Sequence, residues 1–201
     1  QIAAAATATL KRVNLELGGS APVILLDDAD LQSAVPQVVR AAIFISGQQC
    51  VAASRLLVSN SRLEEAKALF AKSLREIVVG SGSDPATQMG PMIDFAARDR
   101  ILRLLDAVKA PDEILVRGVA LDGRHAAGAF ITPSLVHVRD PQSQLITDEI
   151  FGPILTLQSF DTDAEALERA NASRFGLAAS VWSADLARAQ RLARRIEAGT
   201  V

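Results

Sequence analysis

The feature that most constrains the fold is an alternation of short apolar runs with longer segments of helical period along the 201 residues. Residues 22–26 form one such apolar run, and from Leu31 to Ile45 apolar residues recur every three or four positions. Parallel strands need long crossover connections, usually helices, so the alternation is typical of them. The sequence therefore predicts an α/β fold with a mostly parallel, twisted sheet flanked by helices.

The same pattern predicts the remaining elements. Strands are expected at residues 54–58, 130–135, 154–160 and 177–182, and helices at 62–77, 95–108, 163–171 and 184–198.

Local signals predict where several helices begin and end. Pro36 is expected to kink or restart its helix, because proline removes an amide donor, and Gly47 is expected to end that helix as a C-cap. Ser61 and Glu64 have the spacing of a capping box, and Ser183 is the expected N-cap of the last helix.

Composition excludes several classes of function. Hydrophobic residues make up 49% and charged residues 22%, with a net charge of −2, as in ordinary globular domains. Basic residues do not gather with aromatic ones, so no nucleic acid partner is expected. No apolar run reaches the roughly 18–20 residues that span a bilayer, so no membrane partner is expected. The single cysteine excludes an internal disulfide and favours a reducing compartment, the cytoplasm.

That cysteine, Cys50, closes the motif Gly47-Gln48-Gln49-Cys50. A thiol on a loop behind a glycine can act as a nucleophile on a carbonyl carbon, and its own peptide N–H can help to hold the developing oxyanion. The alternative is that Cys50 is a small buried apolar residue, as most lone cysteines are.

A carboxylate stands 34 positions upstream, in Leu15-Glu16-Leu17-Gly18-Gly19. Glu16 would serve as a base, and the paired glycines allow the backbone to turn sharply and approach a ligand closely. The alternative is a solvated glutamate at an exposed edge.

A third motif is Asp148-Glu149-Ile150-Phe151-Gly152-Pro153. A carboxylate such as Glu149 can bind the two hydroxyls of a ribose, and Phe151 can pack against a flat ring. The alternative is an acidic turn that leads into a strand.

In this order and spacing, the three motifs resemble the aldehyde dehydrogenase superfamily of NAD(P)-dependent enzymes. The resemblance runs nearly from end to end. It also includes Asp28-Ala29-Asp30-Leu31, Ser54-Arg55, Met89-Gly90-Pro91, Asn171, Phe175-Gly176-Leu177-Ala178 and Glu197-Ala198-Gly199-Thr200-Val201.

The resemblance implies that Cys50 attacks an aldehyde and that Glu16 activates the water that hydrolyses the resulting thioester. Leu17, Gly18, Glu149 and Phe151 would bind the cofactor, NAD or NADP. A free thiol has a pKa of about 8.5 and is only a few per cent thiolate at neutral pH, so a nearby base is useful.

The resemblance also implies that the chain is a segment of a longer enzyme. Residues 1–18 would be the tail of the coenzyme-binding domain, and residues 19–201 a catalytic domain truncated at its C-terminal end. Ser20 stands where the family often has lysine, a variable position. The segment alone is expected to be inactive, and the full-length protein is expected to form a dimer or tetramer.

Two other functions stay open. A CoA-acylating relative would hand the thioester to a different partner, although such relatives generally lack the hydrolytic glutamate, which Glu16 matches. A catalytically idle homologue would keep only the scaffold.

Other residues are given structural interpretations. His125 and His137 lack the three or four convergent ligands of a zinc site, so no metal is expected. Phe44, on the helix before Cys50, would line an aldehyde channel or belong to the core, and the core is the preferred interpretation. Trp182 is expected to pack internally.

Overall fold

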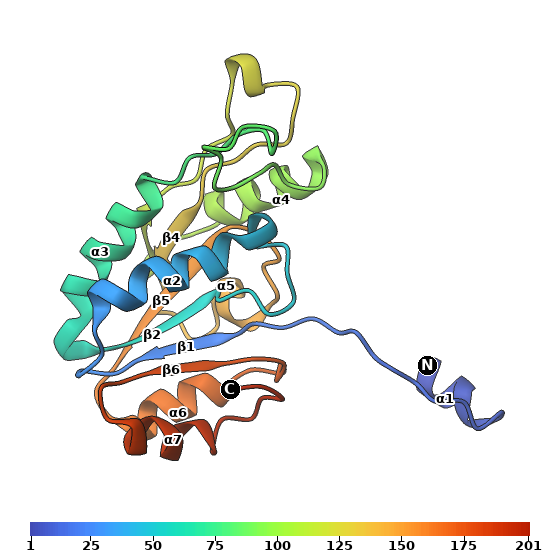
Figure 1. The fold of residues 1–201 in the computed structure, drawn as a ribbon, viewed down its shortest axis with the longest axis vertical. Coiled ribbons are helices and arrows are strands. Elements are labelled where there is room, and N and C mark those ends of the chain that lie inside the picture. The colour runs from blue at the N-terminus through green and yellow to red at the C-terminus, as the bar shows by residue number, and fades with distance from the viewer.

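The computed structural model describes residues 1–201 except for the side chain of Arg124, and one mixed sheet organises the chain (Figure 1). The strand order across this described sheet is β3-β4-β5-β2-β1-β6, and only the β3–β4 pair is antiparallel. The six strands are β1 (Pro22–Leu25), β2 (Arg55–Ser59), β3 (Glu113–Val116), β4 (Ser134–His137), β5 (Ile154–Phe160) and β6 (Ser180–Trp182). The predicted α/β class with a mostly parallel sheet is confirmed.

Helices cover both faces of the sheet. The α-helices are α1 (Ile2–Thr7), α2 (Leu31–Ile43), α3 (Leu63–Arg75), α4 (Phe95–Asp106), α5 (Gln144–Thr147), α6 (Asp163–Asn171) and α7 (Leu186–Ala193). Short 3₁₀ turns occur at η1 (Phe44–Gly47), η2 (Asn60–Arg62) and η3 (Gly123–His125).

Alternate residues of each central strand pack on opposite layers. In β1, Val23 and Leu25 join the core formed with α2 and α3, whereas Ile24 and the adjacent Leu26 join the core formed with α6 and α7. A third cluster packs α4 and α5 against β4 and β5. Because both faces are covered, the strand sequences are continuous apolar runs, without alternation of apolar and polar residues.

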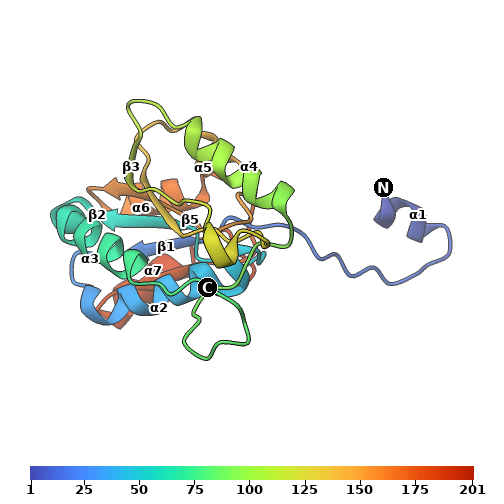
Figure 2. The same cartoon turned by 90° about the horizontal axis from the view of Figure 1, so that it is seen from above.

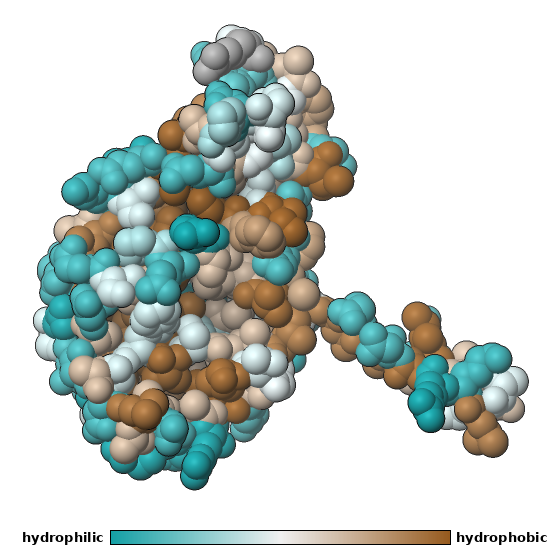
Figure 3. All heavy atoms as spheres, in the orientation of Figure 1, coloured by the Kyte–Doolittle hydropathy of each residue, from teal (hydrophilic) through white to brown (hydrophobic). Residues whose placement is uncertain are grey.

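The amino-terminal segment stands away from this body. Both views show residues 1–17 running outward from the start of β1 (Figure 1, Figure 2). Figure 3 shows apolar surface along this segment and where the segment joins the body of the protein. Its exposed large apolar residues are Ile2, Leu10, Val13, Leu15 and Leu17.

No helix among the described residues has the length and apolarity needed to cross a membrane.

Several predictions about where helices begin, end or kink are wrong. Helix α2 continues through Pro36, whose exposed position leaves the carbonyl that lost its donor on the solvent face. The Ser61 hydroxyl is 3.0 Å from that of Ser59, and Glu64 pairs with Lys67, so the capping box does not form. Asp185, not Ser183, caps α7.

Other boundaries also differ from the prediction. Helix α2 ends at Ile43 rather than at Gly47, and α7 ends at Ala193 rather than near residue 198. The strand expected at 130–135 begins only at Ser134, and that expected at 177–182 begins at Ser180. The short elements β3 and α5 are not predicted by any strong periodicity.

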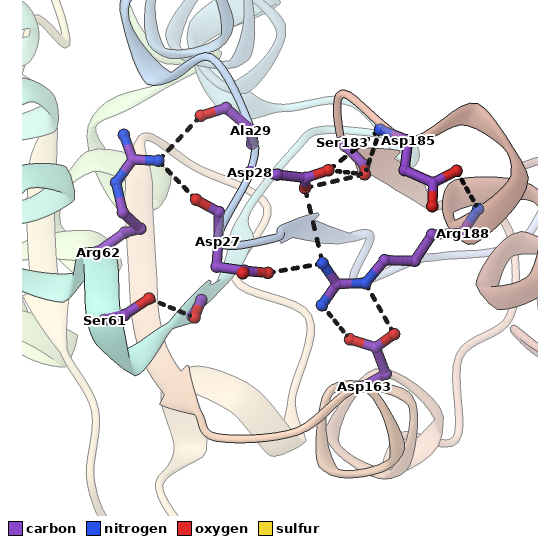
Figure 4. A network of polar contacts seen from close by, with 10 residues as sticks. Asp27, Asp28, Ala29, Ser61, Arg62, Asp163, Ser183, Asp185 and Arg188 are labelled. Carbon is purple, nitrogen blue, oxygen red and sulfur yellow. Dashed lines mark hydrogen bonds and ion pairs between the residues drawn. The ribbon is translucent and has the colours of Figure 1, made fainter.

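At the carboxyl edge of the sheet, an ion-pair network joins the ends of β1, β5 and β6 (Figure 4). Arg188 of α7 binds both carboxylate oxygens of Asp163 and, through Nη1, Asp27 at 2.6 Å. Ser183, which follows β6, donates to Asp28 at 2.8 Å, and Arg62 donates to the carbonyl of Asp27 at 2.7 Å. Within the Asp28-Ala29-Asp30 motif, Asp28 therefore binds Ser183 at this edge, while Asp30 caps α2.

Replacing Arg188 by methionine should lower the free energy of unfolding at pH 7 by about 2 kcal/mol, because it leaves Asp27 and Asp163 without their partner. The hydrogen bonds from Arg188 hold the pKa of Asp163 below its ordinary value. The unfolded state therefore binds its proton at higher pH than the folded state. The stabilisation is present above about pH 4 and is lost as the pH falls further.

Urea unfolding at several pH values measures this effect. Arg194→Met, an exposed change at the end of the same helix, is the control and should shift stability by less than about 0.5 kcal/mol. Equal stability losses for the two variants at pH 7, or a loss for Arg188→Met that persists at pH 2, would contradict the assigned role.

Candidate active site

The three motifs meet at the amino edge of the parallel strands. Residues 18–19 precede β1, Cys50 precedes β2, residues 149–151 precede β5, and residues 175–177 precede β6. The strands are paired in register, with Pro22 opposite Arg55, Arg55 opposite Thr156, and Val23 opposite Ser180. Because all four strands run in one direction, the segments that precede them reach the same edge. In Figure 1 this is the side from which the amino-terminal segment enters β1.

The thiol motif and the first glycine motif touch through their backbones. A Cβ atom on Gly19 would lie 2.2 Å from the carbonyl oxygen of Cys50 and 3.4 Å from Cβ of Leu177. A side chain at residue 19 would therefore displace the backbone of Cys50, so this approach requires glycine. Cys50 itself lies half-buried in a turn.

The third motif joins the same cluster through Glu149. The amide of Gly19 donates to Oε1 of Glu149 at 3.0 Å. A Cβ atom on Gly18 would lie 2.1 Å from Oε2 of the same carboxylate. Gly18 and Gly19 thus lie between the thiol loop and the Glu149 carboxylate, which is held in place by a backbone donor.

Glu16 lies beside this cluster but takes a different partner. Its side chain is exposed and accepts a hydrogen bond from Asn14 at 3.1 Å. It lines a cavity of about 500 Å³, whose other lining residues are Leu15, Leu17, Gly18, Arg174, Phe175, Gly176 and Leu177. Cys50 does not line that cavity, and no hydrogen bond among the described residues joins it to Glu16. The convergence of these two side chains stays a prediction.

The loop that carries Cys50 has an unusual backbone. Ile45, Ser46 and Gly47 have φ angles of 50°, 56° and 70°, in the left-handed region. A β-branched residue is rare there, because its side chain crowds the backbone. This left-handed stretch, rather than a simple glycine cap, turns the chain from α2 toward Cys50.

Residues 90–93 support the thiol loop. The Ser46 hydroxyl lies 2.9 Å from the carbonyl of Gly90 and 3.1 Å from that of Pro91, and donates its hydrogen toward both. The Gln48 side chain accepts from the amide of Ile93 at 3.0 Å. The sequence gives no signal for these contacts beyond the Met89-Gly90-Pro91 motif, because they join segments more than 40 residues apart.

Residues 151–152 contact the same loop. A Cβ atom on Gly47 would lie 2.5 Å from the backbone carbonyl carbon of Gly152. Phe151 also has a left-handed backbone, with φ of 47°, and its ring is 44% exposed. The ring is therefore free to contact a ligand at this edge.

The structure decides some of the remaining interpretations. Phe44 is 58% exposed, so its assignment to the core is wrong: α2 ends at Ile43, and the turn that follows points Phe44 outward. Trp182 packs against the main core, as predicted.

The two histidines occupy different surroundings. His137 is buried in β4, where burial lowers its pKa and keeps the ring neutral at pH 7, and His125 packs edge-on against Phe130. Among the described residues, no group of three or more His, Cys, Asp or Glu side chains is placed to hold a metal ion.

Comparison with known proteins places these features in a family. The sequence model of the aldehyde dehydrogenase family matches residues 1–201. The chain is 38% identical over 202 residues to the betaine aldehyde dehydrogenase of Sinorhizobium fredii, and 38% identical to betaine aldehyde dehydrogenase 1 of Rhizobium meliloti. Each match covers 100% of this chain, which spans only 42% of the length of these relatives.

Solved structures agree with the sequence matches. The betaine aldehyde dehydrogenase of Staphylococcus aureus in complex with NAD+ superposes with a TM-score of 0.91 at 36% identity, over 100% of this chain and 40% of that protein. A mutant of aldehyde dehydrogenase C from Pseudomonas syringae, in complex with NAD+ and octanal, gives a TM-score of 0.92 at 38% identity, over 100% and 41%.

Replacing Ile45 by asparagine should raise the free energy of unfolding by about 1 kcal/mol, because asparagine tolerates the left-handed region and the exposed Ile45 side chain buries little apolar area. Thermal and urea unfolding measure the change. Ile45→Val keeps the branched side chain and serves as the control, with no gain expected. A lower stability for Ile45→Asn would show that residue 45 does not hold this conformation.

Proposed function

Since the chain belongs to the aldehyde dehydrogenase family, we propose that it is the thiol-bearing part of an enzyme that oxidises an aldehyde to a carboxylic acid with NAD+ or NADP+. The main support is the position of Gly19, whose backbone lies against Cys50 and whose amide binds Glu149. This one residue brings the proposed nucleophile and the proposed coenzyme contact to the same place.

Cys50 is the nucleophile in this proposal. Its thiolate adds to the carbonyl carbon of the aldehyde and forms a thiohemiacetal, and the Cys50 amide helps to hold the oxyanion. When bound, NAD(P)+ supplies the acceptor for the hydride that leaves the thiohemiacetal carbon, which becomes the acyl carbon of a thioester on Cys50. The left-handed loop at residues 45–47 presents the thiol for this attack.

Glu16 is the proposed base for the second half of the reaction. Its carboxylate takes a proton from water, the water oxygen adds to the thioester carbon, and the C–S bond breaks to release the carboxylic acid and the Cys50 thiolate. Glu16 lies on the segment that leads directly into Gly18-Gly19. This role requires the exposed Glu16 side chain to leave Asn14 and turn toward Cys50 during the reaction.

The residues present fit the nicotinamide end of the coenzyme. Glu149 is fixed by the Gly19 amide through Oε1, which leaves Oε2 to accept a hydrogen bond from a ribose hydroxyl. The exposed ring of Phe151 and the exposed side chain of Leu17 offer apolar surface to a flat ring. Gly18 contributes by leaving room for the Glu149 carboxylate, whose Oε2 lies where a Cβ atom of residue 18 would be.

We assign residues 1–18 to the coenzyme-binding domain and residues 19–201 to the catalytic domain. Residues 1–17 lie almost wholly exposed, whereas Gly19 and Ser20 are the first buried residues of the body. We also infer a homo-oligomer in the cytoplasm for the full-length enzyme, on the basis of family membership and the single unpaired cysteine.

The names of the similar proteins suggest which substrates to test first. Betaine aldehyde and octanal represent a cationic and a purely aliphatic aldehyde, and both belong in the first screen of the full-length enzyme. Because the Phe44 ring is exposed and lies six positions before Cys50, we propose that it contacts the substituent of the aldehyde.

Replacing Glu16 by glutamine in the full-length enzyme should keep a burst of one NAD(P)H per active site and slow the steady-state rate by about 10²–10⁴-fold, because the thioester forms but is not hydrolysed. Stopped-flow absorbance at 340 nm measures both phases. Cys50→Ser should abolish both the burst and the steady-state rate. Glu76→Gln, which changes an exposed carboxylate at the end of α3, should leave both unchanged.

The same assays test the alternatives. A steady-state rate that requires CoA would identify the enzyme as an acylating relative. Full-length protein that forms no NAD(P)H with any aldehyde, and whose Cys50 resists iodoacetamide at neutral pH, would contradict the proposed function and indicate an idle scaffold.

The 201-residue chain alone should show no aldehyde-dependent NAD(P)H formation, because most of the coenzyme contacts expected of the family lie outside it. Assay of the purified chain beside the full-length enzyme checks this. Comparable turnover numbers for the two would show that the assigned domain division is wrong.

A further inference from the structure

The loop that carries Glu149 and Phe151 depends on one helix for its shape. Arg100 of α4 is half-buried, and its Nη2 donates to the backbone carbonyls of both Ile150 and Phe151, the latter at 3.3 Å. A charged donor that holds two carbonyls forms stronger hydrogen bonds than a neutral one. These are contacts to the backbone, so they act on the path of the loop rather than on any single side chain.

The next residue of α4 supports the same loop. A Cβ atom on Gly152 would lie 2.3 Å from Cδ1 of Ile101, so the Ile101 side chain packs directly on the Gly152 backbone. Ile101 is fully buried in the core cluster of α4 and α5. Two adjacent residues of α4 thus hold the loop, one by packing and one by hydrogen bonds.

The loop needs such support because its backbone is unfavourable. Phe151 has φ of 47°, and a bulky residue in the left-handed region is less stable than in ordinary backbone conformations, because its side chain crowds the backbone. Arg100 binds the carbonyls on either side of the Phe151 Cα atom, so its hydrogen bonds span the residue whose backbone is left-handed. Without them, residues 149–151 would relax toward other conformations.

The consequence reaches the proposed coenzyme contacts. Glu149 lies one residue before Ile150 and binds the amide of Gly19, which touches Cys50. A change in the path of the loop therefore moves the Glu149 carboxylate and the Phe151 ring together.

We propose that Arg100 is a positioning residue for coenzyme binding: it fixes the backbone from which Glu149 and Phe151 contact the nicotinamide end. This inference rests on the proposed function, since it assumes that these two residues bind the coenzyme. Arg100 acts through them and touches neither the aldehyde nor Cys50.

The test compares three variants of the full-length enzyme. Arg100→Met keeps an apolar stem of similar length and removes the donors, and Arg100→Lys keeps the charge with a single donor group. Arg103→Met is the matched control, because Arg103 is exposed on the same helix and has no hydrogen bond to residues 149–152 among the described residues.

The KM for the coenzyme should rise about tenfold in Arg100→Met, rise less in Arg100→Lys and stay unchanged in Arg103→Met. AMP, which carries only the adenosine half of the coenzyme, is the second probe. Its inhibition constant should be the same in all four proteins, because the loop faces the nicotinamide end. Thermal unfolding confirms that each variant is folded. If Arg100→Met does not fold, the rise in the coenzyme KM of Arg100→Lys tests the proposal instead.

Three outcomes separate the possible failures. Unchanged coenzyme KM in the Arg100 variants would overturn the positioning role. A parallel rise in the AMP inhibition constant would also overturn it, because it would show a general loosening of the protein. Wild-type enzyme that reduces no coenzyme with any aldehyde would instead refute the proposed function, before any variant is compared.

Discussion

The in-register parallel pairing of β1, β2, β5 and β6 is the constraint on which the rest of the structure depends. It brings the segments that precede these strands to one edge, so motifs more than 100 residues apart touch, as Gly19 and Glu149 do. A slip of one residue in any strand would exchange its two apolar faces. In β1 such a slip would turn Val23 and Leu25 away from α2 and α3. The hydrophobic core therefore fixes the register, and the register fixes the site.

Arg55 ties this arrangement to the helical layer. It begins β2, five residues after Cys50, and is only 2% exposed. Its guanidinium donates to the carbonyl of Ser20 at 3.1 Å and to that of Ala170, near the end of α6, at 2.9 Å. Burial lowers its pKa to about 10, so it remains charged at neutral pH, where the partial negative charge at the end of a helix favours it. The glycine motif and α6 are thus held by one buried cation.

The opposite edge of the sheet is closed by polar contacts. There the ends of β1, β5 and β6 are joined by Asp27, Asp163 and Arg188. One edge is thus fixed by ion pairs, while the other is built from glycines and left-handed turns that leave room for a ligand. Strained backbone gathers at the second edge, at Ile45 and Phe151, as it often does near functional sites.

The sequence predicts the strands and helices of the sheet well where apolar periodicity is strong, as in β5 and α6, whose bounds match the prediction within a residue. It predicts capping poorly: Ser61 and Ser183 have the right residue type, but the Ser61 hydroxyl lies beside that of the neighbouring Ser59, and Ser183 binds Asp28, 155 positions away in the chain. The prediction that Phe44 belongs to the core is wrong because helix α2 ends at Ile43 and the backbone turns left-handed from Ile45 onward.

The motifs identify the candidate site because they coincide in order and spacing. The residues that support it, such as Arg100 and Ser46, carry no local signal, because their partners lie 44 or more positions away in the chain. For Glu16, the sequence motif and the structure point to different positions. Its motif and its position on the segment leading to Gly18 favour a role beside Cys50, while its hydrogen bond to Asn14 places the carboxylate elsewhere.

The central claim is that Cys50 carries the acyl group during turnover, and mass spectrometry of acid-quenched full-length enzyme tests it most directly. With octanal and coenzyme, the peptide containing Cys50 should gain the mass of an octanoyl group, and hydroxylamine should remove it. Product formation without any acyl group on that peptide at any quench time would contradict the account.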